Sequence, residues 1–392
     1  MKKKIAGNVS FVGYIDWDLK NFHGVDYKIR NGSSQNAYLI EEEKTVLIDT
    51  VYKPNKCDFV KNLENSIDLK KIDYIVINHA ECDHSGALCA LIKKIPNVPI
   101  FCSMLTKNSL VGQYGDLDFN FNIVKNMDEL DIGCGKKLKF IDMKMLHWPD
   151  SMATYLTGDE ILFSNDAFGQ HFAVEELFAD KADPLLLEKE ALKYFVNILN
   201  PFSPILLKKL DELENLNLPI KIIAPSHGAI WRKNPTQILE KYRKWADGYS
   251  SDQITIVYDT MWEGTKKLAN HIANEISLKK PDTIVKVFNI SKTDKNEITT
   301  EIFKSYMVFV GSPTVNNSIM SSVAGFLEYV KQLKFKNKKA AAFGCYGWSG
   351  ESVKILQEKL KEAGFDVNEN VIKSLWNPNK EFLDNIKVLN YI

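Results

Sequence analysis

The feature that most constrains this chain is a short run of metal-binding residue types, His79-Ala80-Glu81-Cys82-Asp83-His84. Three further residues of the same kind, His147, Asp166 and His227, follow at long intervals, and each is expected at the end of a strand. Of only seven histidines in the chain, four belong to this set. Four imidazoles and three carboxylates predict a site for two metal ions, in which the two oxygens of Asp166 can bridge the ions.

The spacing within the run predicts how its side chains are divided. His79, Glu81 and Asp83 alternate along the chain, so they point the same way if the backbone stays extended after the strand. His84 is adjacent to Asp83, so this pair can reach the second ion. Cys82 then points the opposite way and is not expected to be a ligand.

Composition excludes several classes of protein. The chain has 392 residues, enough for about two domains, and its 50 basic residues balance its 50 acidic ones. This balance predicts no affinity for nucleic acid, and no stretch is apolar enough for a membrane span, so we expect a soluble, cytoplasmic protein. The six cysteines form no C-x-x-C pair, which argues against a disulfide framework or an iron–sulfur site.

A change of pattern near residue 250 predicts two domains, 1–250 and 251–392, joined by a linker at 247–251. The second domain alternates strand and helix signals, which is typical of a doubly wound parallel sheet. Its expected strands are 254–258, 284–290, 306–310 and 340–343, with a helix at 264–278. The first domain is less regular and predicts a layered α/β fold with a mixed sheet. Its expected strands are 37–40, 45–48, 74–77, 99–102, 138–145, 155–164 and 220–224, and a helix is expected at 235–246.

Three loops of the second domain follow strands at the edge where such sheets bind ligands. Residues 258–265 lead from the first strand into a helix, where backbone N–H groups and hydroxyls can hold a phosphate. Residues 311–317 and 343–350 contain glycines that let the backbone approach a flat ligand, and Tyr346 and Trp348 offer faces for stacking. Each loop alone is more often a simple turn, so the prediction depends on all three.

The motif His79-x-Glu81-x-Asp83-His84, with His147, Asp166 and His227, resembles the metallo-β-lactamase fold, whose usual run is H-x-H-x-D-H. Glu81 replaces the second histidine, which moves the metal preference from zinc toward iron or manganese. This variant, joined to a flavodoxin-like domain, resembles the flavodiiron proteins (A-type flavoproteins) along essentially the entire chain. The resemblance implies an α/β chain with an N-terminal metallo-β-lactamase-like αββα sandwich and a C-terminal flavodoxin-like doubly wound parallel sheet.

The resemblance also implies cofactors and their ligands. It assigns His79, Glu81 and His147 to one iron of a non-haem diiron site, Asp83, His84 and His227 to the other, and Asp166 to the bridge. It assigns the three loops to FMN, through Thr260, Met261, Trp262, Gly264, Thr265, Ser312, Pro313, Thr314, Val315, Asn316, Tyr346, Gly347, Trp348, Ser349 and Gly350. His23, His171 and Tyr194 match active-site positions of the family, where they would hydrogen-bond or supply protons, and a purely structural role for them is an equal alternative.

Taken together, the resemblance implies an oxidoreductase that reduces dioxygen to water, nitric oxide to nitrous oxide, or both. Electrons would come from a separate rubredoxin-like or flavoprotein donor and pass through FMN. A head-to-tail homodimer, alone or as a dimer of dimers, would bring FMN of one subunit to the irons of the other. Two alternatives stay open: a dizinc hydrolase with an attached flavodoxin-like domain, and an electron carrier whose first domain is only structural.

Overall fold

The computed structural model describes residues 2–115 and 117–392. The chain forms two compact units, and the first contains the residues up to Phe195 together with Phe202–Arg243. The second contains Val196–Pro201 and Lys244–Ile392. None of the helices in the described part of the chain combines the length and hydropathy that a membrane crossing requires.

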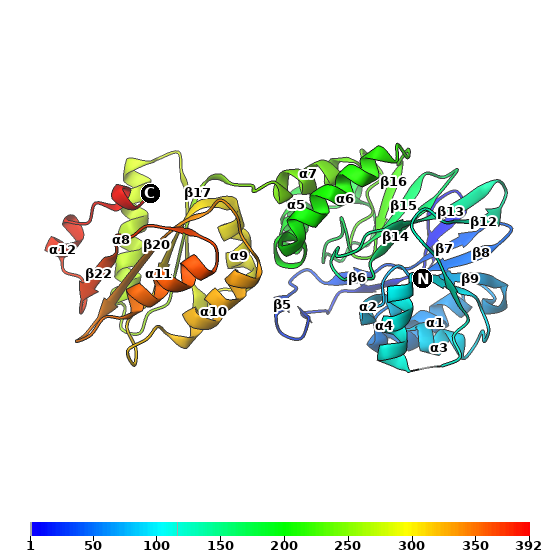
Figure 1. Ribbon diagram of the computed structural model, residues 1–392, viewed down its shortest axis with the longest axis horizontal. Coiled ribbons are helices and arrows are strands. Elements are labelled where there is room, and N and C mark those ends of the chain that lie inside the picture. Colours follow the sequence, from blue (N-terminus) through cyan, green and yellow to red (C-terminus); the bar gives the residue numbers. More distant parts are fainter. Residues whose placement is uncertain (1, 116) are drawn as a thin grey trace. The chain divides into compact units, whose positions relative to one another are not determined.

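Two β-sheets form the centre of the first unit (Figure 1). The seven-stranded sheet has the order β1 (Lys3–Ala6), β2 (Val9–Phe11), β7 (Tyr38–Glu41), β8 (Thr45–Ile48), β9 (Ile72–Val76), β10 (Ile100–Cys102) and β11 (Phe121–Ile123). The five-stranded sheet has the order β12 (Glu129–Gly133), β13 (Lys136–Asp142), β14 (Met152–Leu156), β15 (Ile161–Asn165) and β16 (Ile222–Pro225). Two short pairs lie outside them: β3 (Tyr14–Asp16) with β6 (Ser33–Gln35), and β4 (Asn21–Phe22) with β5 (Tyr27–Lys28).

Alternation along the strands explains why both faces of the seven-stranded sheet are covered. Ile40 and Ile48 lie in a buried cluster with Phe140 of the five-stranded sheet, so their side chains point between the sheets. Leu39 and Leu47, one residue away on the same strands, lie in a second cluster with side chains of helices on the outer face. Two faces that are both apolar require a layer on each side of the sheet.

The helices of the first unit are α1 (Lys56–Glu64), α2 (Cys82–Ser85), α3 (Leu88–Ile92), α4 (Met104–Tyr114), α5 (Pro184–Tyr194), α6 (Ser203–Asn215) and α7 (Gln237–Ala246), the last of which ends beyond the unit. Residues of α1, α3 and α4 belong to the cluster outside the seven-stranded sheet. Together with the core between the sheets, this arrangement confirms the predicted αββα sandwich.

The second unit contains one sheet in which every pairing is parallel. Its order is β18 (Ile284–Asn289), β17 (Ser251–Tyr258), β19 (Ser305–Gly311), β20 (Lys339–Tyr346) and β21 (Asp366–Val367), and β22 (Ile372–Leu375) also pairs with β20. Its helices are α8 (Gly264–Lys279), α9 (Lys295–Lys304), α10 (Ser321–Gln332), α11 (Ser352–Glu362) and α12 (Lys380–Asp384). This strand order is that of flavodoxin-like sheets, and it confirms the predicted doubly wound fold.

Local chemistry explains where the sequence-based elements were wrong. The single strand expected at 155–164 is a hairpin of β14 and β15, because Gly158 adopts φ +81° and Glu160 adopts φ +60° in the turn between them. The strand expected at 138–145 ends at Asp142, and the expected linker 247–251 overlaps β17, which begins at Ser251.

Candidate metal centre and flavin-binding cavity

The loops that follow strands of both sheets in the first unit bring the predicted metal-binding side chains together. His79, Glu81, His147 and Asp166 form one group, in which all the ligand atoms lie within 4.8 Å of one another. Asp83, His84 and His227 form a second group by the same measure. All seven residues of the predicted set therefore lie in these two groups.

The expectation that Asp83 points the same way as Glu81 is wrong. Glu81 is extended, with φ −56° and ψ 148°, but α2 begins at the next residue and rotates Asp83 toward the second group. His147 also departs from its expected place at a strand end, because β13 ends five residues earlier, at Asp142. Cys82 is in neither group, and its thiol donates a hydrogen bond to Gln113 Oε1 at 2.9 Å.

Asp166 lies between the two groups and presents one oxygen to each. Its Oδ2 is 3.7 Å from Nε2 of both His79 and His147 in the first group. Its Oδ1 is 3.2 Å from His84 Nε2 and 3.4 Å from His227 Nε2 in the second. A carboxylate in this position can bridge two cations.

The distances between ligand atoms within each group fit the binding of one metal ion per group. His79 and His147 Nε2 lie 3.3 and 3.2 Å from Glu81 Oε2. In the second group, His84 and His227 Nε2 lie 3.3 and 3.0 Å from Asp83 Oδ2. Ligand atoms about 2.1 Å from one ion are about 3.0–3.4 Å apart, so both groups have the spacing of a coordination sphere.

Several buried polar atoms of the two groups have no hydrogen-bond partner within residues 2–115 and 117–392. They are both carboxylate oxygens of Asp83, Nε2 of His84 and Oδ2 of Asp166. Buried polar groups in proteins are nearly always satisfied, so such a concentration of unsatisfied acceptors indicates that a cation completes the site.

Electrostatics favour positive charge at this site. Burial lowers the pKa of His227, but the adjacent carboxylates of Asp166 and Asp83 outweigh burial and raise this pKa to about 10. Burial raises the pKa of Asp166, but the neighbouring His84 and His227 outweigh it and hold the pKa well below its ordinary value. The Asp166 carboxylate therefore stays ionised and stabilises cations beside it.

The three further histidine and tyrosine positions lie beside the groups. His23 Nε2 donates to Glu81 Oε1 at 3.1 Å, and Tyr194 OH donates to Asp166 Oδ1 at 3.1 Å. His171 Nδ1 lies 2.8 Å from Ser33 Oγ. Burial lowers the pKa of His171 well below its ordinary value, so its ring is neutral. Its Nε2 is buried without a hydrogen-bond partner in the described chain.

One residue that the sequence analysis missed is Asp150, a buried carboxylate three residues after His147. It accepts a hydrogen bond from Nδ1 of His79, the ring nitrogen opposite the one that faces the first group. The signal available in the sequence was an acidic residue in the same loop as a predicted ligand. Only the fold brings this loop against His79.

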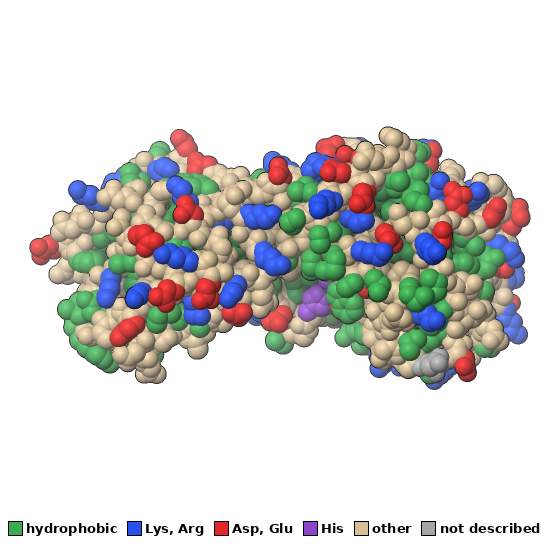
Figure 2. Space-filling view, in the orientation of Figure 1, with side chains coloured by type: hydrophobic (Ala, Val, Ile, Leu, Met, Phe, Trp, Pro, Cys, Tyr) green, Lys and Arg blue, Asp and Glu red, His purple; other side chains and the backbone are tan. Residues whose placement is uncertain are grey.

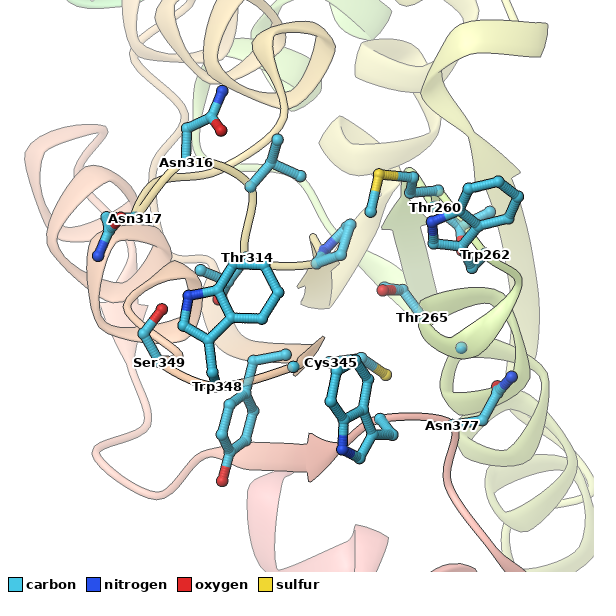
Figure 3. A pocket seen from close by; sticks show the side chains of 17 residues that line it. Thr260, Trp262, Thr265, Thr314, Asn316, Asn317, Cys345, Trp348, Ser349 and Asn377 are labelled. Atoms are coloured by element: carbon cyan, nitrogen blue, oxygen red, sulfur yellow. The ribbon is translucent and has the colours of Figure 1, made fainter.

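A cavity of about 630 Å³ lies at the carboxyl edge of the parallel sheet in the second unit (Figure 3). All three predicted loops line it, and Trp262 and Trp348 lie on opposite sides of it. Of the fifteen predicted FMN contacts, thirteen line the cavity. The lining predicted residues are Thr260, Met261, Trp262, Gly264, Thr265, Pro313, Thr314, Val315, Asn316, Tyr346, Gly347, Trp348 and Ser349.

The end of the cavity next to α8 fits a phosphate. Thr260 and Thr265 have buried hydroxyl oxygens with no hydrogen-bond partner among the described residues. Thr265 lies in the first turn of α8, a helix of 16 residues whose N-terminal N–H groups attract anions. The negative charge of Glu263, in the same loop, would repel a phosphate, but its side chain is exposed and pairs with Lys266 at 2.5 Å.

The structure changes the list of cavity residues in two ways. Ser312 and Gly350 are not among the lining residues; the Ser312 hydroxyl instead donates to Pro313 O and accepts from Met320 N. Four further residues line it: Asn317 and Cys345, which lie in two of the predicted loops, and Trp376 and Asn377, which lie outside them. Burial raises the pKa of Cys345 to about 11, so this thiol is neutral.

Trp376 and Asn377 follow β22, the last strand of the sheet. The backbone N–H of Trp376 donates to Tyr346 O at 2.7 Å, which holds its indole against Gly347. A Cβ at Gly347 would lie 2.8 Å from the indole, so a larger residue would force the indole to shift. The sequence signal that could have identified Trp376 and Asn377 was their place directly after a strand, at the carboxyl edge of the sheet.

Comparisons with known proteins extend these observations over the whole chain. Residues 33–228 match the family model described as "ODP family beta lactamase", and residues 256–383 match that described as "Flavodoxin". The chain is 51% identical over 374 residues to the anaerobic nitric oxide reductase flavorubredoxin of Vibrio vulnificus strain YJ016, covering 95% of this chain and 76% of that protein. The chain belongs to the flavodiiron protein family.

Solved structures agree with this membership. The rubredoxin:oxygen oxidoreductase of the anaerobe Desulfovibrio gigas superimposes with a TM-score of 0.95 at 37% identity, covering 100% of this chain and 98% of the other. The flavodiiron protein of Giardia intestinalis gives 0.93 at 33% identity, covering 98% and 93%. The predicted family, fold, and cofactor types, FMN and non-haem diiron, are confirmed, whereas the roles of individual residues stay predictions.

Proposed function

We propose that this flavodiiron protein reduces dioxygen to water, nitric oxide to nitrous oxide, or both. The observation that carries the proposal is the pair of ligand groups that share Asp166, in a chain that also has a cavity suited to FMN. One similar protein is named a nitric oxide reductase and another an oxygen oxidoreductase, so the relatives support the reaction class and leave both substrates open.

In this proposal His79, Glu81 and His147 would hold one iron, Asp83, His84 and His227 would hold the other, and Asp166 would be shared between them. When bound, the irons supply the electrons and open coordination positions that reduction of a diatomic molecule requires. Three carboxylates make the donor set harder than an all-histidine site, which favours iron over zinc. The carboxylates also balance the charge of oxidised iron inside a buried site.

The residues around the groups are suited to hold substrate and move protons. His23 and Tyr194 each donate a hydrogen bond to a ligand carboxylate, which fixes its orientation. His171 is neutral, and the buried Nε2 with no partner in the described residues can bind a small polar molecule. We assign orientation of the ligand carboxylates to His23 and Tyr194, and contact with the substrate or with water to His171.

We propose that FMN occupies the cavity of the second unit, with its phosphate at the N-terminus of α8 and its ring near Trp348 and Tyr346. The unsatisfied hydroxyls of Thr260 and Thr265 would donate to the phosphate. The aromatic side chains would stack on the ring and exclude water from it. Together with the loop glycines, they make the second domain, residues 251–392, the FMN domain, and residues 1–250 the diiron domain.

Electrons would reach FMN from a separate protein, and the name of the Desulfovibrio gigas relative points to a rubredoxin as donor. We also propose a head-to-tail homodimer, alone or paired into a tetramer. The cavity rim exposes Trp262 and Trp348 at 79% and 86%, and Trp17 and Val25, on the chain segment around His23, are also exposed. Large exposed apolar side chains on both units favour mutual burial between subunits.

The test is metal and flavin analysis of protein purified without oxygen, followed by stopped-flow mixing of the reduced protein with dioxygen and, separately, with nitric oxide. The proposal expects about two irons and one FMN per chain and fast reoxidation by at least one gas. Two zinc ions with activity on an ester or thioester would support the hydrolase instead, and flavin without metal would support the electron carrier. Sedimentation at two protein concentrations tests the dimer.

A further inference from the structure

Asp150 connects His79 of the first metal group to the loop that carries His147. Its carboxylate is 2% exposed and accepts from His79 Nδ1, at 3.2 Å through Oδ1 and 3.1 Å through Oδ2. Oδ2 also accepts from the backbone N–H of Ala80 at 2.8 Å. Both bonds fix the segment that begins at His79 and continues to Glu81.

The same residue belongs to the loop that carries His147, and that loop is anchored away from the metal groups. The carbonyl oxygen of Asp150 accepts from Thr106 Oγ1 at 3.3 Å and Ser103 Oγ at 3.5 Å, at the start of α4. The ring of Trp148 also packs edge-on against His79, with centroids 5.0 Å apart. The His147 loop therefore holds His79 through a carboxylate and an indole at once.

The second metal group has no matching carboxylate on His227. Nδ1 of His227 donates to the backbone carbonyl of Ser34 at 2.7 Å, which is a neutral acceptor. A carboxylate that accepts from a ligating histidine fixes the tautomer of the ring. It also makes the other ring nitrogen a stronger metal ligand than a carbonyl acceptor would. His79 and His227 thus differ in the charge of the group that accepts from their Nδ1.

We infer that Asp150 is a positioning residue for the first metal group alone. It keeps the Nδ1 proton of His79 pointed away from the site, so that Nε2 is free to bind a cation, and it couples this orientation to the loop of His147. This inference rests on the proposed diiron function and deepens it, since it makes the two iron positions chemically unequal.

Asp150→Asn tests this role with little change of volume. The asparagine keeps one acceptor oxygen, and its amide N–H₂ then faces the N–H of His79 or of Ala80, which are both donors. His79 either loses a charged acceptor or adopts the tautomer that carries a proton on Nε2. Both outcomes weaken the first group, and loss of such a partner lowers metal affinity by about 10–100-fold.

Asp73→Asn is a matched control in the same unit. Asp73 also accepts from one backbone N–H, that of Thr45 at 2.8 Å, and from one basic side chain, Lys44 at 3.1 Å. Neither partner belongs to a metal group, so the control removes the same charge and hydrogen-bond pattern without touching the iron ligands.

The measurement is iron retained after a timed chelator challenge, combined with Mössbauer spectra of ⁵⁷Fe-loaded protein. Glu81→Ala and Asp83→Ala provide reference spectra for damage to the first and the second group. We expect Asp150→Asn to lose about one iron of two with a spectrum like that of Glu81→Ala, while Asp73→Asn keeps both irons. FMN content of every variant reports whether the rest of the chain is folded.

Equal loss from both groups, a spectrum like that of Asp83→Ala, or full retention by Asp150→Asn would overturn the inference. If Asp150→Asn does not fold, Thr106→Val replaces it, because it removes one of the two hydroxyls that hold the Asp150 carbonyl and leaves the carboxylate intact. It is expected to release iron from the first group only, and retention or equal release again refutes the role. A wild-type protein without iron would refute the proposed function instead.

Discussion

Replacing Thr265 by valine should shift two measured quantities in opposite directions. The hydroxyl of Thr265 is buried, with the residue 1% exposed, and it has no hydrogen-bond partner in the described part of the chain. A buried hydroxyl without a partner costs about 1–3 kcal/mol. Valine has nearly the same shape and a similar helix propensity, so Thr265→Val should raise the free energy of unfolding of the FMN-free protein by about 1 kcal/mol.

The same change should weaken FMN binding. A hydrogen bond to a charged group contributes about 1.5–3 kcal/mol, and the phosphate of FMN is the partner that we propose for this hydroxyl. The dissociation constant of FMN should therefore increase by about 10–150-fold. Urea unfolding of the FMN-free protein gives the first quantity, and quenching of flavin fluorescence in a titration gives the second.

Thr255→Val is the control, since Thr255 is equally buried in the same unit but its hydroxyl lies 2.8 Å from Ser305 Oγ. This variant should lose about 1 kcal/mol of stability and leave the FMN affinity unchanged. The reasoning is refuted if Thr265→Val destabilises the FMN-free protein as Thr255→Val does, or if it binds FMN as tightly as the wild type.

Three further predictions concern other parts of the chain. Tyr194→Phe removes a hydrogen-bond donor to Asp166, the carboxylate that the two metal groups share, so turnover should fall by roughly 10-fold while the iron content stays unchanged. Gas consumption measures the turnover and an iron assay measures the metal; unaltered turnover would argue for a structural role. Gly347→Ala should displace the Trp376 indole and weaken FMN binding by about 10-fold in a fluorescence titration. Gly325→Ala is the control and should leave FMN binding unchanged, because a Cβ at this helical position meets open space. Burial lowers the pKa of Lys338 from 10.5 to about 8, so the folded state binds fewer protons than the unfolded state between these values. Relative to Lys338→Met, wild-type stability in urea should thus rise by up to about 3 kcal/mol from pH 8 to 10.5, and a flat difference would contradict the shift.

The sequence predicted correctly those strands and helices that depend mainly on neighbouring residues. Residues 45–48 form a strand as expected, because apolar β-branched and aliphatic residues in a short run suit a buried strand. The helix expected at 264–278 is α8, because the glycine at its start and the apolar spacing after it are local signals. The hairpin at 152–165 was missed, since its turn depends on two residues with positive φ, only one of which is glycine.

The balance of basic and acidic residues in the sequence agrees with the mixture of charged side chains on the surface. On the face seen in Figure 2, basic and acidic side chains are interspersed over both units. The total of 50 basic and 50 acidic residues fixes the net charge, but only the fold distributes these charges over a surface. A balanced sequence can still fold into oppositely charged faces, so this distribution was not determined by composition.

The sequence by itself determined the donor types of both sites. Four imidazoles and three carboxylates after strands, and hydroxyls and glycines in loops before helices, are chemical requirements that residue type and order express directly. Tertiary structure alone decided how the donors are divided and supported. The short helix α2 rotates Asp83 into the second group, Asp150 reaches His79 across 71 positions of sequence, and Trp376 closes the cavity against Gly347. These contacts depend on packing between segments distant in the chain, which no local pattern encodes.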